Sequence, residues 1–554
     1  MYISVHYDKK KNTVFALEQI NGREIHQEYP AEYFFYTEDK NGKHKSIDDK
    51  FACRHVFTDY QSFSNAYRMY QNKKVPTFEA KVRPLFKTLE KHYKKISKVN
   101  LRKCYFDIET DFDAGDNTRD GRGYAPPDDP FNRVTAITFY NNWEGILYSL
   151  SLPPKHISLD EAEKMLAHFP NNLVCESEEQ MFELFFELTK DAHVYAGWNS
   201  SIFDVPYLVN RTKRILGLEA TKNFCLWGYK PQARTIENYG KEVQIYDLVG
   251  KVHLDMMELY RKYTYTEQPS YSLDYISSIE LGENKVAYDG SLDKLYNEDY
   301  VKFIDYARQD TNLLYRLDQK KDHINLAFTI AHENRVDLKT VMGTVALSDN
   351  AITLEAHRRG MITPDYHNDG DTKIPGAWVA DPQVGITNWV GSVDLTSLYP
   401  SIFRAFNLGN ETIIGQIKLD MTMPIIEEKL SKETTDELGN VIKKKEEKFA
   451  AAWKEFFNVL EFDEILNKTD KELTLILEDG SEHKMKASEI YDFVFNNDFT
   501  ITPYCTIIRN DKQSVVASLL ERWFNERKQF QNRSETYQKL TAGIELPKHI
   551  LEKL

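Results

Sequence analysis

The segment KCYFDIET, which begins at residue 103, places two carboxylates on one face of a predicted strand. Successive side chains of a strand point to opposite faces, so Tyr105, Asp107 and Glu109 share one face. Phe106 and Ile108 share the other. Neighbouring carboxylates repel each other and need compensating positive charge, which Mg²⁺ or Mn²⁺ supplies through carboxylate ligands. Exposed edge strands also carry pairs of acids, so a metal site requires that further carboxylates converge here.

Two other acids are candidates for that convergence. Asp204 directly precedes a helix that we expect from about Val205 to Leu216, so it could also be a simple helix N-cap. Tyr306 and Asp310 are four residues apart on another expected helix and therefore share one face. Taken alone, that pair would also fit a surface acid beside a core tyrosine. The sequence predicts a metal site only if these acids meet.

The chain between residues 100 and 320 alternates strand-like and helical runs, which predicts an α/β domain. The pattern breaks near residue 370. The apolar run ITNWVGSV then predicts a strand that delivers a single carboxylate, Asp394. The polar segment from Ser431 to Lys448 predicts a surface turn or loop, and one long helix is expected from about Gln513.

A basic segment runs from Lys81 to Lys103 and carries nine Lys or Arg residues against one acid. Four apolar residues recur in it at helical spacing: Phe86, Leu89, Tyr93 and Ile96. On its own the segment favours a solvated helix face. The motifs described below support a phosphate-contacting surface about equally well.

The composition is that of an ordinary globular protein, with 41% hydrophobic and 28% charged residues. The formal net charge of −14 does not suggest nucleic-acid binding, but local patches and not net charge decide such binding. The five cysteines form no CxxC pair, which favours a reducing compartment. No apolar run approaches the roughly 18 residues that a membrane span needs.

The acidic motifs occur in a recognisable order: D-x-E, then N-x(2–3)-F/Y-D with Asn199 and Phe203 in the flanking positions, then Y-x3-D. This set resembles the exonuclease site of family B DNA polymerases, most closely those of T-even-like phages. The resemblance implies an RNase H-like domain that removes nucleotides from the 3′ end of DNA with two Mg²⁺ or Mn²⁺ ions. It implies four metal ligands and a water-orienting tyrosine, namely Asp107, Glu109, Asp204, Asp310 and Tyr306.

The segment VDLTSLYPSI resembles the first polymerase motif of the same family. The resemblance implies that Asp394 binds both catalytic metals and that the Leu395 carbonyl completes one of them. The backbone around Ser397, Leu398 and Tyr399 would hold the incoming triphosphate, and the Tyr399 ring would exclude a 2′-hydroxyl. A core aromatic beside a bend is the other interpretation of Tyr399.

The segment RWFNERKQF resembles the first fingers helix, and Arg527 stands where the family has a triphosphate-binding arginine. Gln531 stands where the subfamily often has a lysine, and Lys528 lies on a different face of the helix. Between the second and third exonuclease motifs, RTIENYGKEVQIY predicts a β-hairpin. It resembles the hairpin that separates primer from template in this subfamily, although an ordinary surface hairpin would look the same.

Two motifs of the family are missing from the sequence. Neither the second polymerase carboxylate motif, D-T-D, nor the fingers motif K-x3-N-S-x-Y-G occurs, and the D-T at residues 310–311 belongs to the exonuclease. We therefore expect polymerase activity to need a second chain with the remaining fingers, palm and thumb, whether the gene is split or the sequence truncated. A stand-alone 3′→5′ DNA exonuclease and a nucleic-acid-binding regulator are the alternatives.

We expect a mixed α/β, multidomain fold. Its predicted parts are an N-terminal domain (1–98), an RNase H-like exonuclease domain (99–323), a segment returning to the N-terminal domain (324–370), a partial palm (371–512) and the start of the fingers (513–554). The resemblance implies primer–template DNA and deoxynucleoside triphosphates as ligands. It also implies a second polymerase subunit, through which a sliding clamp and other replisome proteins would be reached. It implies no membrane association and places the protein in the cytoplasm of an infected bacterial host.

Overall fold

The structure is a computed structural model, and it describes residues 1–116, 119–238, 240–365, 384–395, 397–422, 434–435, 441–443 and 460–541. The chain forms two compact units. The first comprises Met1–Tyr33, Val56–Ala66 and Val82–Asn350; the second comprises Phe34–His55, Tyr67–Lys81 and Ala351–Leu554. The boundaries of these units differ from the domain boundaries expected from the sequence. The expected domain boundaries stay a prediction.

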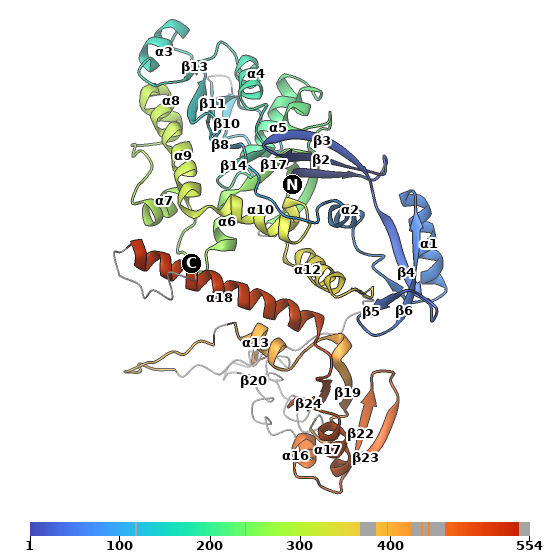
Figure 1. The fold of residues 1–554 in the computed structure, drawn as a ribbon. Helices are drawn as coiled ribbons and strands as arrows, with labels where there is room; N and C mark the ends of the chain where they lie inside the picture. Colours follow the sequence, from blue (N-terminus) through green and yellow to red (C-terminus); the bar gives the residue numbers. More distant parts are fainter. Residues whose placement is uncertain are drawn as a thin grey trace. The chain divides into compact units, whose positions relative to one another are not determined.

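A six-stranded sheet forms the centre of the first unit (Figure 1). Its strands, in spatial order, are β13 (Asn172–Val174), β12 (Ile146–Ser151), β11 (Val134–Asn141), β8 (Lys103–Thr110), β14 (Val194–Gly197) and β17 (Val252–Asp255). The acid-bearing strand β8 lies inside the sheet, antiparallel to β11 and parallel to β14. A mixed sheet with helices on both faces confirms the expected α/β organisation.

The two faces of β8 differ as the alternation predicts. Phe106 and Ile108 are buried in a core with residues of α4 (Glu178–Leu188) and α5 (Asp204–Ile215). The opposite face of the sheet packs against α9 (Tyr300–Lys321), and Tyr105 on that face donates a hydrogen bond to Asp318 of α9. Figure 1 shows α9 on one side of the sheet and α4 and α5 on the other. The carboxylates of β8 therefore face α9.

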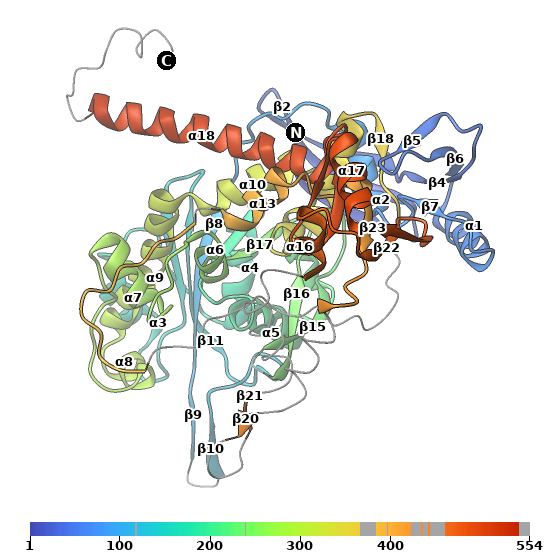
Figure 2. The same ribbon diagram turned by 90° about the horizontal axis from the view of Figure 1, so that it is seen from below.

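The other elements of the first unit surround this sheet. A three-stranded antiparallel sheet consists of β1 (Tyr2–Asp8), β2 (Thr13–Ile20) and β3 (Arg23–Pro30). Two hairpins form two-stranded sheets of their own: β9 (Asp113–Asp116) with β10 (Arg119–Gly123), and β15 (Gln232–Asn238) with β16 (Lys241–Asp247). Figure 2 shows that the β9–β10 hairpin projects from the unit. The remaining helical elements are α2 (Pro84–His92), α3 (Leu159–Leu166), η1 (Ala220–Phe224), α6 (Met256–Tyr263), α7 (Leu273–Leu281), α8 (Leu292–Glu298), α10 (His323–Glu333) and α11 (Leu338–Val341).

The second unit contains two five-stranded sheets. The first has the order β18 (Met361–Ile362), β5 (His44–Ser46), β6 (Phe51–Phe57), β4 (Tyr33–Glu38) and β7 (Thr77–Phe78). The second has the order β23 (Glu482–Lys486), β22 (Glu472–Leu477), β19 (Ile413–Ile417), β25 (Thr506–Arg509) and β24 (Phe499–Ile501). A short pair, β20 (Thr434–Thr435) and β21 (Val441–Lys443), is separate.

The helices of the second unit include the long predicted helix, α18 (Val515–Thr541). The others are α13 (Leu398–Ala405), η2 (Asn410–Thr412), α16 (Leu460–Leu466) and α17 (Ala487–Asn496). The division between the units passes through β6, α1 (Tyr60–Asn72) and α12 (Thr344–Arg358). Because β18 runs parallel to β5, residues 361–362 return to a sheet that N-terminal residues build.

Three expectations from the sequence differ from the structure or fall outside it. The run ITNWVGSV forms no strand, because no described strand pairs with it, and a strand exists only through its ladder. In the basic segment the helix ends at His92, so Ile96 lies outside it and is exposed. Residues 366–383 of the return segment and palm, most of the segment from Ser431 to Lys448, and residues 542–554 of the fingers lie outside the described residues.

Several cations of the basic segment have partners inside the fold. Lys103 forms a buried ion pair with Asp318, and Lys91 pairs with Glu32 at 2.5 Å. Lys87 is also buried. A solvated or structural role therefore accounts for these three lysines. Only the exposed lysines between His92 and β8 remain candidates for phosphate contacts.

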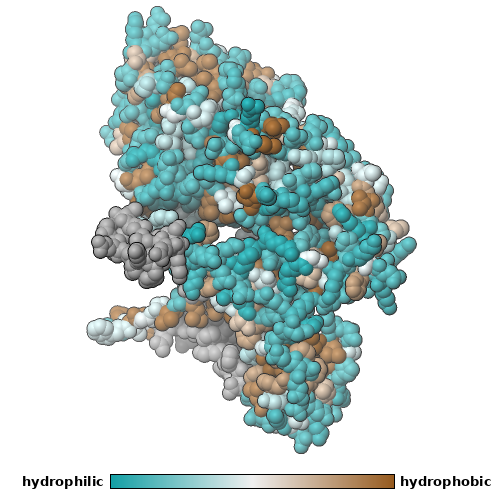
Figure 3. Space-filling view, in the orientation of Figure 1, coloured by the Kyte–Doolittle hydropathy of each residue, from teal (hydrophilic) through white to brown (hydrophobic). Residues whose placement is uncertain are grey.

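Hydrophilic residues cover most of the face seen in Figure 3, and hydrophobic residues form small, scattered patches on it. A search of the described helices finds none that combines the length and the apolar character required to cross a membrane.

Candidate active site

Three acidic side chains meet where β8 packs against α9. One carboxylate oxygen from each of Asp107, Glu109 and Asp310 lies within 4.8 Å of the others. Glu109 is only 8% exposed and Asp310 only 2%. Within the part of the chain that the structure describes, this is the single group of three or more His, Cys, Asp or Glu residues close enough to share a metal ion. The acids of the D-x-E motif and of the Y-x3-D motif therefore lie close together in the structure.

Asp204 lies beside this trio but is not part of it. The residue opens α5, where Phe203 occupies the N-cap position, so the N-cap interpretation of Asp204 was wrong by one residue. Its buried carboxylate accepts a hydrogen bond from the backbone N–H of Ile108 on β8. The negative charge of Asp204 also acts directly on Asp107. The structure thus brings all four predicted carboxylates to one place, three in close contact and one next to Asp107.

Lys285 supplies the positive charge at this site. Its Nζ atom lies 2.5 Å from Oδ2 of Asp310 and donates a second hydrogen bond, at 3.1 Å, to the hydroxyl of Tyr306. Tyr306 and Asp310 share one face of α9, as their spacing predicted, and Asp310 is buried where the other interpretation placed it on the surface. One ammonium facing several carboxylates leaves the cluster short of positive charge.

The pKa values of the cluster show this shortage. Burial and then the charges of Asp204, Glu109 and Asp310 raise the pKa of Asp107 well above its ordinary value. Burial and the charge of Asp310 raise the pKa of Glu109 to about 8, and burial raises that of Asp204 to about 7. The protein alone therefore disfavours the fully ionised cluster at neutral pH.

These features fit a divalent cation. The donor set consists of carboxylate oxygens, which Mg²⁺ and Mn²⁺ prefer. Oδ1 of Asp310 is buried without a hydrogen-bond partner, although most buried polar atoms have one. A bound cation would both coordinate such an oxygen and supply the missing charge. Asp107, Glu109, Asp204 and Asp310 are the residues that would hold it.

Replacement of Glu109 by glutamine is expected to stabilise the metal-free protein at high pH. The pKa of Glu109 rises from 4.5 to about 8 on folding, so the folded chain keeps a proton that the unfolded chain releases. The stability of the parent therefore falls as the pH rises through this interval. At pH 8 we expect Glu109→Gln to be more stable by at least about 1.4 kcal/mol, the equivalent of one pKa unit.

Chemical unfolding in EDTA at two pH values measures this difference. It should vanish near pH 4, where Glu109 is protonated in both states, and Mg²⁺ should stabilise the parent more than the variant. Glu163→Gln on α3, which changes an exposed acid, serves as the matched control. Equal stability of parent and Glu109→Gln at pH 8 would contradict the raised pKa.

The candidate triphosphate-binding residues lie where α13 begins. Ser397 is the N-cap residue of α13, with a left-handed φ of 55°, and Leu398 and Tyr399 form the first turn. Nη1 of Arg527 on α18 donates a hydrogen bond of 3.4 Å to Oγ of Ser397. The structure therefore brings Arg527 to the turn that the polymerase motif provides. Tyr399 is 65% exposed, so the core-aromatic interpretation does not hold for it here.

Asp394 is exposed and belongs to no carboxylate group among the described residues. Leu395 is also exposed, 64%. The next acid in the described chain, Glu411, is buried, and its Oε1 accepts the backbone N–H of Val515 at the start of α18 at 2.6 Å. Glu411 therefore has a structural task. Among the described residues, no second group of three or more His, Cys, Asp or Glu residues is close enough to share a metal ion.

Two functional candidates were not found from the sequence. Lys285 lies in the segment GENKVAYDG, where nothing local separates it from the other 70 Lys and Arg residues. The segment VHLDMMEL indicates that Asp255 is the N-cap of a helix, and in the structure it caps α6. Its hydrogen bond to the loop before Asp204 could not be predicted, because it depends on the order of the strands in the sheet. Neither residue carries a local signal that reveals its partners.

Comparison with known proteins agrees with this site. The model of DNA polymerase family B, exonuclease domain, matches residues 57–276, and that of DNA polymerase family B matches residues 348–451. The chain is 30% identical over 344 residues to the DNA-directed DNA polymerase of Escherichia phage RB69, which covers 59% of this chain and 37% of that protein. It is 32% identical over 226 residues to the DNA-directed DNA polymerase of Enterobacteria phage T4, 41% of this chain and 25% of that protein.

A more distant relative is the DNA polymerase delta catalytic subunit of Bos taurus, 26% identical over 260 residues, which are 43% of this chain and 23% of that protein. The matched segment thus spans well under half of each of these relatives. The two family matches together cover more than half of the 554 residues, and the four carboxylates and Tyr306 come from the three motifs on which the resemblance rested. The chain belongs to the family B DNA polymerases, with an exonuclease domain and part of a polymerase domain in a mixed α/β fold.

Proposed function

We propose that this chain is the proofreading part of a phage replicative DNA polymerase and removes nucleotides from the 3′ end of DNA. The observation that carries the proposal is the convergence of Asp107, Glu109 and Asp310, with Asp204 beside Asp107. Asp107, Glu109 and Asp204 lie within residues 57–276, which match the family's exonuclease model. A cluster with this charge deficit suits metal-assisted phosphodiester hydrolysis better than a binding role.

Each residue has a definite task in this proposal. Asp107, Glu109, Asp204 and Asp310 would hold the catalytic cations. When bound, the two cations would provide a hydroxide nucleophile near neutral pH and neutralise the departing 3′ oxygen. The Tyr306 hydroxyl accepts a hydrogen bond from the Lys285 ammonium, and its own O–H would orient the attacking water. A mispaired terminal nucleotide reaches the site because unpaired bases are cheaper to unstack.

The direct test uses single-stranded DNA labelled at its 5′ end, with Mg²⁺ or with EDTA. We expect a ladder of products that shorten one nucleotide at a time, only with the divalent cation present. Release of the label as a mononucleotide, or degradation in EDTA, would contradict a metal-dependent 3′→5′ activity.

For the polymerase half we propose DNA-templated DNA synthesis that requires further carboxylates from a second polypeptide. Asp394 and the Leu395 carbonyl would hold the catalytic cations, and the turn of Ser397, Leu398 and Tyr399 would hold the triphosphate with Arg527. The proximity of Arg527 and Ser397 supports the triphosphate assignment. Backbone N–H groups at a helix start commonly bind phosphate.

Replacement of Tyr399 by alanine is expected to admit ribonucleotides in the reconstituted polymerase. The ring stands exposed at the start of α13, where it can fill the space of a 2′-hydroxyl. We expect discrimination against ribonucleotides to fall by about tenfold or more, equivalent to about 1.4 kcal/mol. Primer extension with ribo- and deoxynucleotides measures it. Tyr399→Phe, which keeps the ring, should discriminate against ribonucleotides as the parent does. Unchanged selectivity in Tyr399→Ala would contradict the role of Tyr399 in excluding the 2′-hydroxyl.

A stand-alone 3′→5′ DNA exonuclease is the second candidate function. The isolation of Asp394 from other acids among the described residues favours it. The two candidates differ in one measurement, namely whether a polypeptide with the missing D-T-D motif confers primer extension on this chain.

The ligands in the polymerase proposal are primer–template DNA, deoxynucleoside triphosphates and Mg²⁺ or Mn²⁺. The proposed partners are the second polymerase subunit and, through it, a sliding clamp and other replisome proteins. The phage origin of the two relatives at 30% and 32% identity supports action in the cytoplasm of an infected bacterium.

A further inference from the structure

A short loop, residues 198–203, delivers Asp204 to the carboxylate cluster. Its backbone is unusual: Asn199 has a left-handed φ of 57°, which few residues other than glycine adopt. Gly197, just before the loop, has no room for a side chain, because an added Cβ would lie 2.7 Å from Oγ of Ser200 and 3.2 Å from the carbonyl oxygen of Phe106. A crowded, partly left-handed loop persists only where surrounding groups fix it.

The main anchor of this loop is the carboxylate of Asp255 at the end of β17. Oδ1 accepts the backbone N–H of Asn199 at 2.9 Å, and Oδ2 accepts that of Ser201 at 3.0 Å. Oδ1 also caps α6 by accepting the N–H groups of Met257 at 3.0 Å and Glu258 at 3.5 Å. Asp255 is 4% exposed. One buried carboxylate thus joins the start of α6 to the loop.

Two further contacts hold the loop but carry no charge. The hydroxyl of Ser200 and Nε2 of His253 form a hydrogen bond of 2.9 Å, and burial lowers the pKa of His253 to about 4, so this imidazole is neutral. Nε1 of Trp198 donates to the carbonyl oxygen of Tyr271 at 2.9 Å. Each of these contacts supplies a single hydrogen bond, whereas the Asp255 carboxylate accepts two N–H groups of the loop, which makes it the main anchor.

We infer that Asp255 is a positioning residue of the nuclease, whose carboxylate holds the loop so that Asp204 reaches the cation beside Asp107. This inference rests on the exonuclease function proposed above. Residues that hold metal ligands in place affect metal affinity or activity by about 10- to 100-fold when removed, and Asp255 acts on Asp204 through two backbone amides. Asp255 contacts neither the cluster nor the substrate in this role.

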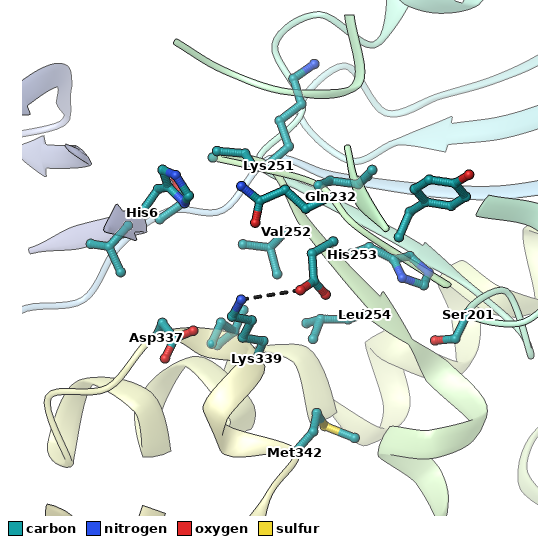
Figure 4. A pocket seen from close by; sticks show the side chains of 18 of the residues that line it. His6, Ser201, Gln232, Lys251, Val252, His253, Leu254, Asp337, Lys339 and Met342 are labelled. Atoms are coloured by element: carbon teal, nitrogen blue, oxygen red, sulfur yellow. Dashed lines mark hydrogen bonds and ion pairs between the residues drawn. The ribbon is translucent and has the colours of Figure 1, made fainter. Parts of the chain in front are cut away.

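A cavity beside Asp255 makes the inference testable by chemical rescue. Ser201, His253 and Asp255 line a space of about 160 Å³ (Figure 4), which also borders Asp337 and the ion pair of Lys339 with Asp247. This volume admits a small carboxylate such as formate next to the loop amides.

The first test separates the two tasks of Asp255 with the variant Asp255→Ser. Serine is an equally good N-cap, so α6 keeps its cap, but the shorter hydroxyl cannot accept from both loop amides. We expect the maximal nuclease rate to fall about 10- to 100-fold and the Mg²⁺ concentration for half-activation to rise, with an unchanged KM for single-stranded DNA. Asp255→Asn, which keeps one acceptor oxygen, should be intermediate.

Asp337→Ser is the matched control. Asp337 is a buried acid that lines the same cavity and occupies the N-cap position of α11, but it does not contact the loop. We expect its nuclease rate and Mg²⁺ dependence to equal those of the parent.

Two measurements without turnover test the same point. In Asp255→Ser, hydrogen exchange of the peptide covering residues 198–204 should be faster, because the amides of Asn199 and Ser201 lose their acceptor. Calorimetric titration with Mn²⁺, without DNA, should show weaker binding by about the same factor as the loss in rate. A variant that only lowered global stability would change neither at a temperature where the protein is fully folded.

Formate provides the converse experiment. In Asp255→Ala, added formate should restore both slow exchange of the loop and nuclease rate in a concentration-dependent manner. Asp204→Ala, which lacks the ligand itself, should not respond. Rescue of Asp204→Ala alongside Asp255→Ala would show a general effect of formate and overturn the inference.

The outcomes distinguish the inference from the function on which it rests. Parent-like rate, Mg²⁺ dependence and loop exchange in Asp255→Ser, with an inactive Asp107→Ala, would overturn only the positioning role of Asp255. Full activity in Asp107→Ala would overturn the nuclease assignment. If Asp255→Ala does not fold, Asp255→Ser and Asp255→Asn still decide the question.

Discussion

The double variant Asp107→Ala, Glu109→Ala is expected to lose 3′→5′ nuclease activity by at least about 10³-fold, or about 4 kcal/mol of transition-state stabilisation. Two of the three carboxylates that meet within 4.8 Å disappear, which leaves only Asp204 and the Asp310 that is paired with Lys285. Because these groups bind metal and not DNA, the affinity for single-stranded DNA should change little. Rates on 5′-labelled DNA, with Kd measured in Ca²⁺, separate the two effects.

The control for this experiment is Glu163→Ala, Glu183→Ala, which removes two exposed acids from α3 and α4 of the same domain. It should behave as the parent does. The metal-free site variant should also be at least as stable as the parent, because it removes repelling charges whose pKa values burial raises. A double variant that still digests a labelled primer at the parent's rate would show that the site is elsewhere.

The purified chain is expected to degrade DNA but not to extend a primer. Mg²⁺ needs about six oxygen ligands, and two-metal phosphoryl transfer needs a second carboxylate opposite Asp394. The sequence has no D-T-D motif, and among the described residues Asp394 belongs to no group of three or more acids that could share a cation. Glu411, the next described acid along the chain, is engaged with the backbone of Val515. In the proposal above, the missing carboxylates come from a second polypeptide.

Primer extension with and without that polypeptide tests this prediction, with the Asp107→Ala variant used throughout so that nuclease activity does not remove the product. Activity should appear only with both chains present and should disappear in Asp394→Ala. Extension by this chain alone that Asp394→Ala abolishes would show that the described residues omit a carboxylate that this chain itself provides.

Part of the carboxylate cluster could be predicted from local periodicity because its acids lie on regular elements, while their convergence was implied by the family resemblance. The alternation of Asp107 and Glu109 on β8 and the four-residue spacing of Tyr306 and Asp310 on α9 set the directions of these side chains. Lys285 and Asp255 could not be predicted, because their partners are far away in sequence and depend on the order of strands. Propensity alone also misplaced the strand before Asp394, since a ladder requires a partner strand.

The alternation of β8 also bears on how the chain avoids misfolding. A slip of one residue in its pairing with β11 would exchange the two faces of the strand. Phe106 and Ile108 would leave the core, and Asp107 and Glu109 would enter it without partners, where unpaired charges cost several kcal/mol each. Lys103 and Tyr105 would at the same time lose their bonds to Asp318. The residues proposed to cut DNA would thus also disfavour a one-residue slip of β8 during folding.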